Sequence, residues 1–130
     1  MPKPFAVLAL AAVLAPAAHA SPRTGFSFGR IGGNIRPYTV VIAADGHVKV
    51  SGGATAGRTL LTKAQLAKLA HVATASHFTS LPAVTSCPRT LPDVAATFVR
   101  VGGRTVRVHG SCLARYQRVW AALGAAVHIG

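Results

Sequence analysis

Two glycine turns, each enclosed by β-branched and apolar residues, set the main constraint on the fold. Asp45-Gly46 lies between the runs 35–43 and 48–50, and Gly102-Gly103 lies between 94–101 and 104–109. A glycine turn between two such runs is typical of a β-hairpin, because glycine readily adopts the positive φ angles of tight turns. The sequence therefore predicts two hairpins and four strands.

The first hairpin has two alternative registers. A three-residue loop, 44–46, places five apolar side chains on one face, whereas with a two-residue loop, 45–46, the faces of the second strand swap relative to the first. We favour the three-residue loop, because it gathers more apolar area on one side. The five side chains are Tyr38, Val40, Ile42, Val48 and Val50.

The turn at 102–103 fixes the second hairpin more firmly. Val99 then faces Val106, and Thr97 faces Val108, on one side of the sheet. Phe98 faces Arg107 on the other side, where Arg100 faces Thr105. One face of this hairpin is therefore predicted to be core and the other to be basic.

A helix is predicted after each hairpin. Thr62, with Gln65 three residues later, forms a capping-box pattern at the start of a helix over 63 to about 76. Apolar residues recur at helical spacing in this helix (Leu66, Leu69, Ala70, Ala73) and in the one that follows Gly110-Ser111 (Tyr116, Val119, Trp120, Leu123, Val127). The order predicts an α+β fold, ββαββα, with a four-stranded, mainly antiparallel sheet and both helices on one face.

The first twenty residues have the three parts of a secretory signal peptide. Lys3 supplies the positive charge, residues 5–15 the apolar run, and Ala18-His19-Ala20 the cleavage site. The run is about 11 residues long, whereas a membrane span needs about 20. We expect cleavage after Ala20, secretion or retention in the cell envelope, a glycine-rich and irregular segment over 21–34, and a single domain over 35–130.

The two cysteines, Cys87 and Cys112, are predicted to form a disulfide bond, because an exported protein enters an oxidising compartment. Two free thiols are the alternative. The bond would close a loop of about 26 residues and tie the proline-rich segment 82–93 to the start of the second helix.

Charge is the most unusual bulk property of the chain. Fourteen Lys and Arg stand against two acidic residues, Asp45 and Asp93, and the loss of Lys3 with the signal peptide leaves a net charge of +11. Such a field attracts polyanions. The alternative is that the arginine excess reflects a G+C-rich coding sequence.

The candidate binding residues follow from that charge. Arg100, Arg104 and Arg107 form the densest basic cluster, and Phe98 beside Arg107 is a candidate cation-π partner. A solvated outer sheet face is the alternative interpretation. Nucleic acid is disfavoured as a partner, because Phe98 is the one aromatic platform in the cluster.

Catalytic and metal-binding patterns are absent from the sequence. A nucleophilic triad needs an orienting acid, and Asp45 is already explained as a turn residue. The five histidines after residue 20 show no HExxH-type or helical i, i+4 pairing. We therefore expect no enzyme activity, no cofactor and no metal site.

The order of short motifs resembles a family of small exported bacterial domains of unknown function. The motifs are Pro37-Tyr38, Asp45-Gly46, Leu61-Thr62 before a helix ending near Phe78, and Pro92-Asp93 before a glycine-turn hairpin. The stretch 32–36, Gly-Gly-Asn-Ile-Arg, is also remotely similar to emfourin-type inhibitors of thermolysin-like metalloproteases. That resemblance implies a contact loop built on Gly32, Gly33 and Arg36.

These features together predict a secreted, non-catalytic binding domain with a basic surface. Its expected partner is an acidic secreted protein, a protease or a cell-envelope polyanion. Inhibition of a secreted metalloprotease and binding of a wall or other polyanion are the two alternatives.

Overall fold

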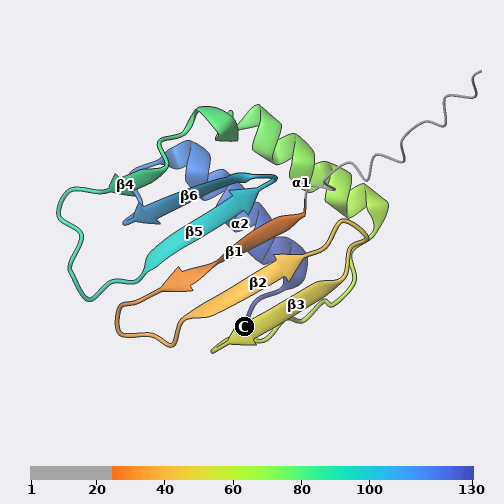
Figure 1. Cartoon of the computed structure of the whole chain (residues 1–130), viewed down its shortest axis with the longest axis horizontal. Helices are drawn as coiled ribbons and strands as arrows, with labels where there is room; N and C mark the ends of the chain where they lie inside the picture. The colour runs from red at the N-terminus through yellow and green to blue at the C-terminus, as the bar shows by residue number, and fades with distance from the viewer. Residues whose placement is uncertain (1–24) are drawn as a thin grey trace, which may run out of the picture.

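A six-stranded β-sheet forms one layer of the protein and two α-helices form the other (Figure 1). The computed structural model describes residues 25–130, so the predicted signal peptide, residues 1–20, lies outside the described residues. The elements in chain order are β1 (Phe26–Ile31), β2 (Tyr38–Ile42), β3 (Val48–Gly52), α1 (Lys63–Ala75), the short 3-10 helix η1 (Phe78–Ser80), β4 (Val84–Ser86), β5 (Ala96–Val101), β6 (Arg104–His109) and α2 (Ala114–Val127). α2 lies behind the sheet in the view of Figure 1, and α1 runs along the upper right edge and packs against α2 and the same core, so the predicted placement of the helices on one face is confirmed.

The sheet has six strands rather than the predicted four, with the order β3-β2-β1-β5-β6-β4. The prediction that residues 21–34 are irregular is wrong for β1, which lies between β2 and β5 and pairs antiparallel with both. Phe26 and Phe28 of this strand are buried, 5% and 1% exposed, and alternate with Ser27 and Gly29. This alternation has the period of a strand with one face in the core. β1 thereby joins the two hairpins into one sheet.

The second additional strand is β4, which lies between Pro82 and Pro88 in the proline-rich segment, where no strand is predicted from the sequence. It has three residues and pairs parallel with β6, with Thr85 opposite Val108, which makes the sheet mixed. The flanking prolines confine it to the edge, because proline cannot donate to a strand ladder. All other strand pairs are antiparallel.

The favoured register of the first hairpin is confirmed. Ile42 pairs with Val48 and Val40 with Val50, so the loop is 44–46. Gly46 has φ +95°, and a Cβ at this position would lie 2.2 Å from the carbonyl oxygen of Leu61. Glycine is therefore required there both by the backbone angle and by the close approach of the neighbouring chain.

The core lies between the sheet and the two helices. α1 begins with the predicted capping box: the amide N–H of Gln65 donates to Oγ1 of Thr62 at 3.2 Å, and the amide N–H of Thr62 donates to Oε1 of Gln65 at 2.8 Å. The buried side chains of the helices are Leu69, Ala73, Tyr116, Val119, Leu123 and Val127, and those of the central sheet are Phe26, Phe28, Val40, Ile42, Val48, Val99, Val106 and Val108. Trp120 of the predicted stripe packs against this core while remaining half-buried.

Candidate functional site

The sheet face opposite the helices is uncovered within residues 25–130 (Figure 1). One cross-strand row on this face runs from Lys49 of β3 through Val41 and Ser27 to Arg100 of β5. The next row contains Phe98 of β5 opposite Arg107 of β6. Three basic side chains therefore share this open face. The two carboxylates of the described chain lie elsewhere, in the hairpin loop 44–46 and in the loop that follows β4.

Phe98 occupies the centre of the open face. It lies opposite Gly29 of β1, and a Cβ at Gly29 would approach the Phe98 ring to 2.9 Å and the carbonyl oxygen of Tyr38 to 2.0 Å. The ring therefore packs across the glycine and is half-buried, while the glycine is buried beneath it. An aromatic side chain over a glycine on the neighbouring strand compensates for the side chain that glycine lacks.

Phe98 and Arg107 are cross-strand neighbours, as predicted. Within residues 25–130, however, the cation-π contact joins Arg30 to Trp120, with the guanidinium carbon 5.9 Å from the ring centroid. Trp120 also meets the Phe28 ring edge-on at 5.6 Å. This stacked set lies on the helix-covered side of the sheet. The sequence did not reveal it, because β1 was not recognised as a strand.

The three arginines of the predicted basic cluster are not brought together. Arg100 and Arg107 lie on the open face, where the Nε–H of Arg100 donates to the carbonyl of Gly102 at 3.2 Å. Arg104 pairs with Val101 and projects to the opposite side, where its guanidinium donates to the carbonyl of Leu81. The separation of Arg104 from Arg107 could have been predicted from the sequence, because residues an odd number of positions apart in a strand face opposite sides of the sheet.

The loop 32–37 contains the other candidate binding residues, Gly32, Gly33 and Arg36. The amide N–H of Asn34 donates to the carbonyl of Asp93 at 3.0 Å, and its side-chain Nδ2 donates to Asp93 Oδ2 at 3.1 Å. Gly32 and Gly33 have φ angles of +68° and +73°. Both glycines and Arg36 are exposed. The loop is thus held against its neighbour while presenting its outer side to solvent.

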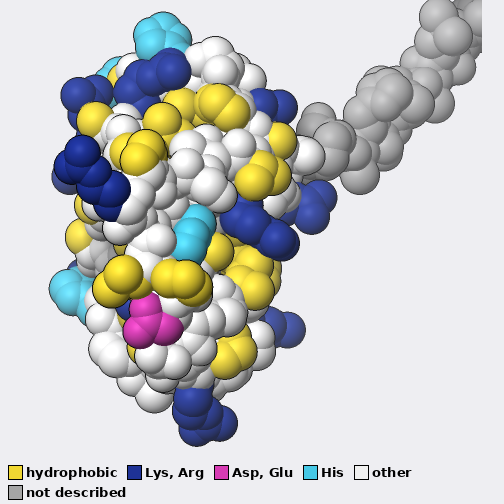
Figure 2. Space-filling model, turned by 90° about the vertical axis from the view of Figure 1, so that its left-hand side faces the viewer, with side chains coloured by type: hydrophobic (Ala, Val, Ile, Leu, Met, Phe, Trp, Pro, Cys, Tyr) yellow, Lys and Arg dark blue, Asp and Glu magenta, His cyan; other side chains and the backbone are white. Residues whose placement is uncertain are grey.

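Figure 2 views the end of the molecule where this loop and the loop 87–95 meet. Basic side chains are spread over this view among apolar ones, and one acidic side chain is in sight. The exposed apolar residues of the two loops include Ile35, Leu91 and Val94. The positive charge is therefore not limited to the open sheet face but is also present at this end of the molecule.

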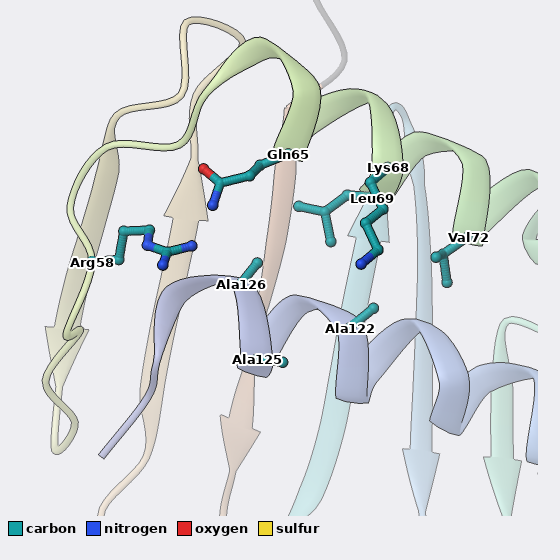
Figure 3. Close-up of a pocket in the computed structure, with 8 residues that line it drawn as sticks. All are labelled: Arg58, Gln65, Lys68, Leu69, Val72, Ala122, Ala125 and Ala126. Carbon is teal, nitrogen blue, oxygen red and sulfur yellow. The ribbon is translucent and has the colours of Figure 1, made fainter.

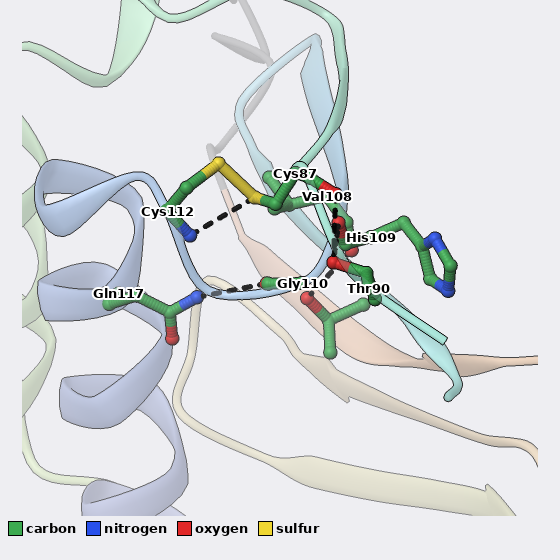
Figure 4. The surroundings of a disulfide bond; sticks show 8 residues. Cys87, Thr90, Val108, His109, Gly110, Cys112 and Gln117 are labelled. Carbon is green, nitrogen blue, oxygen red and sulfur yellow. Dashed lines mark hydrogen bonds between the residues drawn. A yellow bond between two sulfur atoms is a disulfide. The ribbon is translucent and has the colours of Figure 1, made fainter. Parts of the chain in front are cut away.

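The predicted disulfide bond between Cys87 and Cys112 is confirmed, with the Cα atoms 5.6 Å apart (Figure 4). Backbone and side-chain hydrogen bonds surround it. The amide N–H of Cys87 donates to the carbonyl of His109 at 2.8 Å, and Oγ1 of Thr90 donates to the carbonyl of Cys87 at 2.9 Å. The bond ties the loop after β4 to the segment that begins α2.

Three titratable side chains, Asp45, His47 and His109, make local polar contacts. Nδ1 of His47 lies 3.0 Å from Asp45 Oδ2, and the backbone and side-chain hydrogen bonds from His47 lower the pKa of Asp45. Both side chains are about two-thirds exposed, so this pair adds little stability. Nε2 of His109 lies 2.8 Å from the carbonyl oxygen of Val94. Residues 25–130 contain no group of three His, Cys, Asp or Glu side chains arranged to hold a metal ion.

A groove between α1 and α2 is a feature that the sequence did not reveal (Figure 3). Its volume is about 300 Å³, and it is lined by Arg58, Gln65, Lys68, Leu69, Val72, Ala122, Ala125 and Ala126. The helices can leave this space because α2 presents alanines to α1, and alanine fills little volume. The recurrence of alanine at 122, 125 and 126 is the sequence signal that could have found it.

Comparison with protein-family models, curated proteins and solved structures finds no match to this chain. The resemblances to a family of exported domains and to emfourin-type inhibitors therefore stay predictions. Among residues 25–130, no helix combines the length and the apolar character that crossing a membrane requires. The fold and its open face define a two-layer α+β protein with one basic, uncovered sheet surface.

Proposed function

We propose that this protein is an exported, non-catalytic binding domain whose open sheet face receives an acidic partner. The observation that carries the proposal is the composition of that face: Lys49, Arg100 and Arg107 lie on it, and neither described carboxylate does. A protein face with charges of one sign attracts a ligand of the opposite charge and raises the rate at which the two associate. Export follows from the predicted signal peptide, with cleavage after Ala20.

The spacing of the three cations favours an extended anion over a small one. Arg100 and Arg107 are diagonal neighbours on adjacent strands, a relation that places two residues about 7–8 Å apart. Lys49 lies three strands away from Arg100, or about 14 Å at the usual strand separation. This exceeds the Debye length of about 8 Å at physiological salt. A ligand with several charges along its length can therefore meet all three side chains, whereas a single small anion cannot.

The surroundings of the two aspartates support a non-catalytic role. Asp45 accepts the amide N–H of His47 within the hairpin loop, at 3.1 Å. Asp93 accepts from Asn34 and joins two loops. Each carboxylate thus has a structural role. Neither one is linked through a histidine to a serine or cysteine nucleophile, as a catalytic triad requires.

Charge removal from one face at a time tests the proposal. The double variant R100Q/R107Q removes two charges from the open face, and the control K63Q/R118Q removes two exposed charges from the helices. We expect R100Q/R107Q to elute from an immobilised long-chain polyphosphate at a lower salt concentration than the control does. Equal shifts for the two variants would contradict the proposal, because they would mean that net charge alone governs binding.

The salt dependence of binding distinguishes a polyanion from a specific acidic protein. Wild-type protein should be passed over the envelope fraction and the secreted proteins of the producing cell and eluted with a salt gradient. Steep loss of affinity with salt is expected for a polyanion. Retention of one protein at high salt would instead identify a specific acidic protein, and the same open-face variant should then release it.

A second candidate function is inhibition of a secreted metalloprotease, as the emfourin-type resemblance implies. The observation that favours it is the loop 32–37, which is exposed but held to the neighbouring loop by two hydrogen bonds between Asn34 and Asp93. A preorganised exposed loop loses little conformational freedom on binding. We expect R36A to abolish a stoichiometric, salt-tolerant inhibition of a thermolysin-like protease, and R89A, an exposed arginine of the other loop, to leave it unchanged.

A further inference from the structure

The groove between α1 and α2 has an apolar floor. Leu69 and Val72 of α1 face Ala122, Ala125 and Ala126 of α2 across a space of about 300 Å³ (Figure 3). Pockets of this size that combine apolar walls with a few polar groups are typical of small-molecule sites. The floor favours an apolar ligand chain, because covering these side chains removes apolar surface from water.

The polar side chains of the groove supply mainly hydrogen-bond donors. Arg58 and Lys68 carry donors and no acceptor. The Oε1 atom of Gln65 already accepts the amide N–H of Thr62 in the capping box, at 2.8 Å, which leaves its Nε2 donors for the groove. Figure 3 shows the amide nitrogen of Gln65 directed toward the groove and the guanidinium of Arg58 at the same end. The complementary group is therefore an anionic acceptor.

Arg58 is held at this end of the groove by the backbone around it. Its amide N–H donates to the carbonyl of Val127 at 3.1 Å, and the amide N–H of Gly57 donates to the carbonyl of His128 at 2.9 Å. The negative end of the α2 dipole favours a cation here and accounts for Arg58 taken alone. It does not account for Gln65 and Lys68, which project from α1 on the other side of the groove.

We propose that this groove binds an amphipathic carboxylate, a fatty acid of medium chain length. The carboxylate accepts from Arg58 and Gln65, and the chain lies along the alanines of α2 toward Val72. Lys68 extends between Leu69 and Ala122, where its methylene stem covers the chain. A space of about 300 Å³ holds roughly ten heavy atoms at the volume of a liquid water molecule, about 30 Å³ each. This matches the ten carbon atoms of decanoate, whose two carboxylate oxygens then lie at the open end of the groove beside Arg58 and Gln65.

This site is independent of the proposed function. It lies on the helical side of the molecule, whereas the acidic partner is proposed for the opposite face of the sheet. Loss of decanoate binding would therefore leave the polyphosphate result unaffected, and the reverse also holds.

Calorimetric titration of the full chain with decanoate, below its micelle concentration, tests the proposal. Decanol, which has the chain without the charge, and acetate, which has the charge without the chain, should each bind at least about tenfold more weakly. Saturable binding of decanoate with both controls weaker is expected. Equal binding of decanol would contradict the donor argument, and equal binding of acetate would contradict the role of the alanine floor.

Substitutions in the groove test whether decanoate binds there. R58Q should weaken decanoate binding about tenfold, since it removes a charged hydrogen bond. A126L fills the floor without changing charge and should weaken it at least as much. The matched controls are K63Q on α1 and A121L on α2, both exposed positions outside the groove. Unchanged affinity in A126L, or equal losses in A126L and A121L, would overturn the proposal.

Discussion

Removal of the disulfide bond should cost the protein a large share of its stability. Replacing Cys87 and Cys112 with alanine opens a loop of 26 residues, since the sequence separation is 25. In the chain-entropy description, closing a loop of this length destabilises the unfolded state by roughly 3.5 kcal/mol. Each kcal/mol changes the melting temperature of a domain of about 100 residues by about 4–5 °C. The double variant should therefore melt about 15 °C lower than the oxidised wild type.

The assay is thermal and urea unfolding of the full chain, followed by circular dichroism. Wild-type protein measured in reductant is the control and should melt close to the double variant. A decrease of less than about 5 °C would refute the loop-entropy reasoning. It would mean that the hydrogen bonds of Cys87 with His109 and Thr90 hold the loop without the covalent bond.

Three further perturbations test the core and its supports. Burial raises the pKa of the Tyr116 hydroxyl to about 12, whereas the pKa of a tyrosine in the unfolded chain is near 10. The unfolded state therefore loses this proton at lower pH, and the free energy of unfolding should decrease between pH 10 and 12. Y116F should make this decrease smaller in unfolding measured as a function of pH. G29A should destabilise by more than about 2 kcal/mol in urea, because its Cβ would lie 2.0 Å from the Tyr38 carbonyl oxygen, whereas G103A, with open space around it, should be nearly neutral. T62A should cost about 1 kcal/mol through loss of the α1 cap, and T62S should restore most of it.

Local patterns predicted most of the fold. The hairpin between Tyr38 and Gly52 was predictable in register, because its apolar residues alternate and Gly46 defines the loop. The capping box of α1 was predictable because it depends on two residues three positions apart. These features are short-range in sequence, and their physical causes are contained in a few neighbouring residues.

The strands that escaped prediction depend on distant partners. β1 contains Gly29, a residue that disfavours strands, and its conformation is stabilised by pairing with β5, about 70 residues later. Its alternating phenylalanines were the available signal. β4 is too short for a periodic pattern and exists only because β6 offers a free edge. In both cases tertiary pairing overrides local propensity.

The candidate site was predictable in part. The opposition of Phe98 and Arg107 followed from the Gly102-Gly103 turn. The contribution of Lys49 required the position of β1, which connects the two hairpins, and the groove between α1 and α2 required the relative placement of the helices. Neither arrangement is encoded in a short stretch of sequence.

The most direct test of the open-face proposal is a residue-by-residue map of binding. The isotope-labelled chain should be titrated with long-chain polyphosphate, and the backbone amide shifts recorded by NMR at low and physiological salt. We expect the largest shifts in β5, β6 and β3, at and beside Arg100, Arg107 and Lys49, with those shifts decreasing as salt rises. Shifts limited to α1 and α2, or spread evenly over all exposed arginines, would contradict the proposal that the open sheet face is the binding surface.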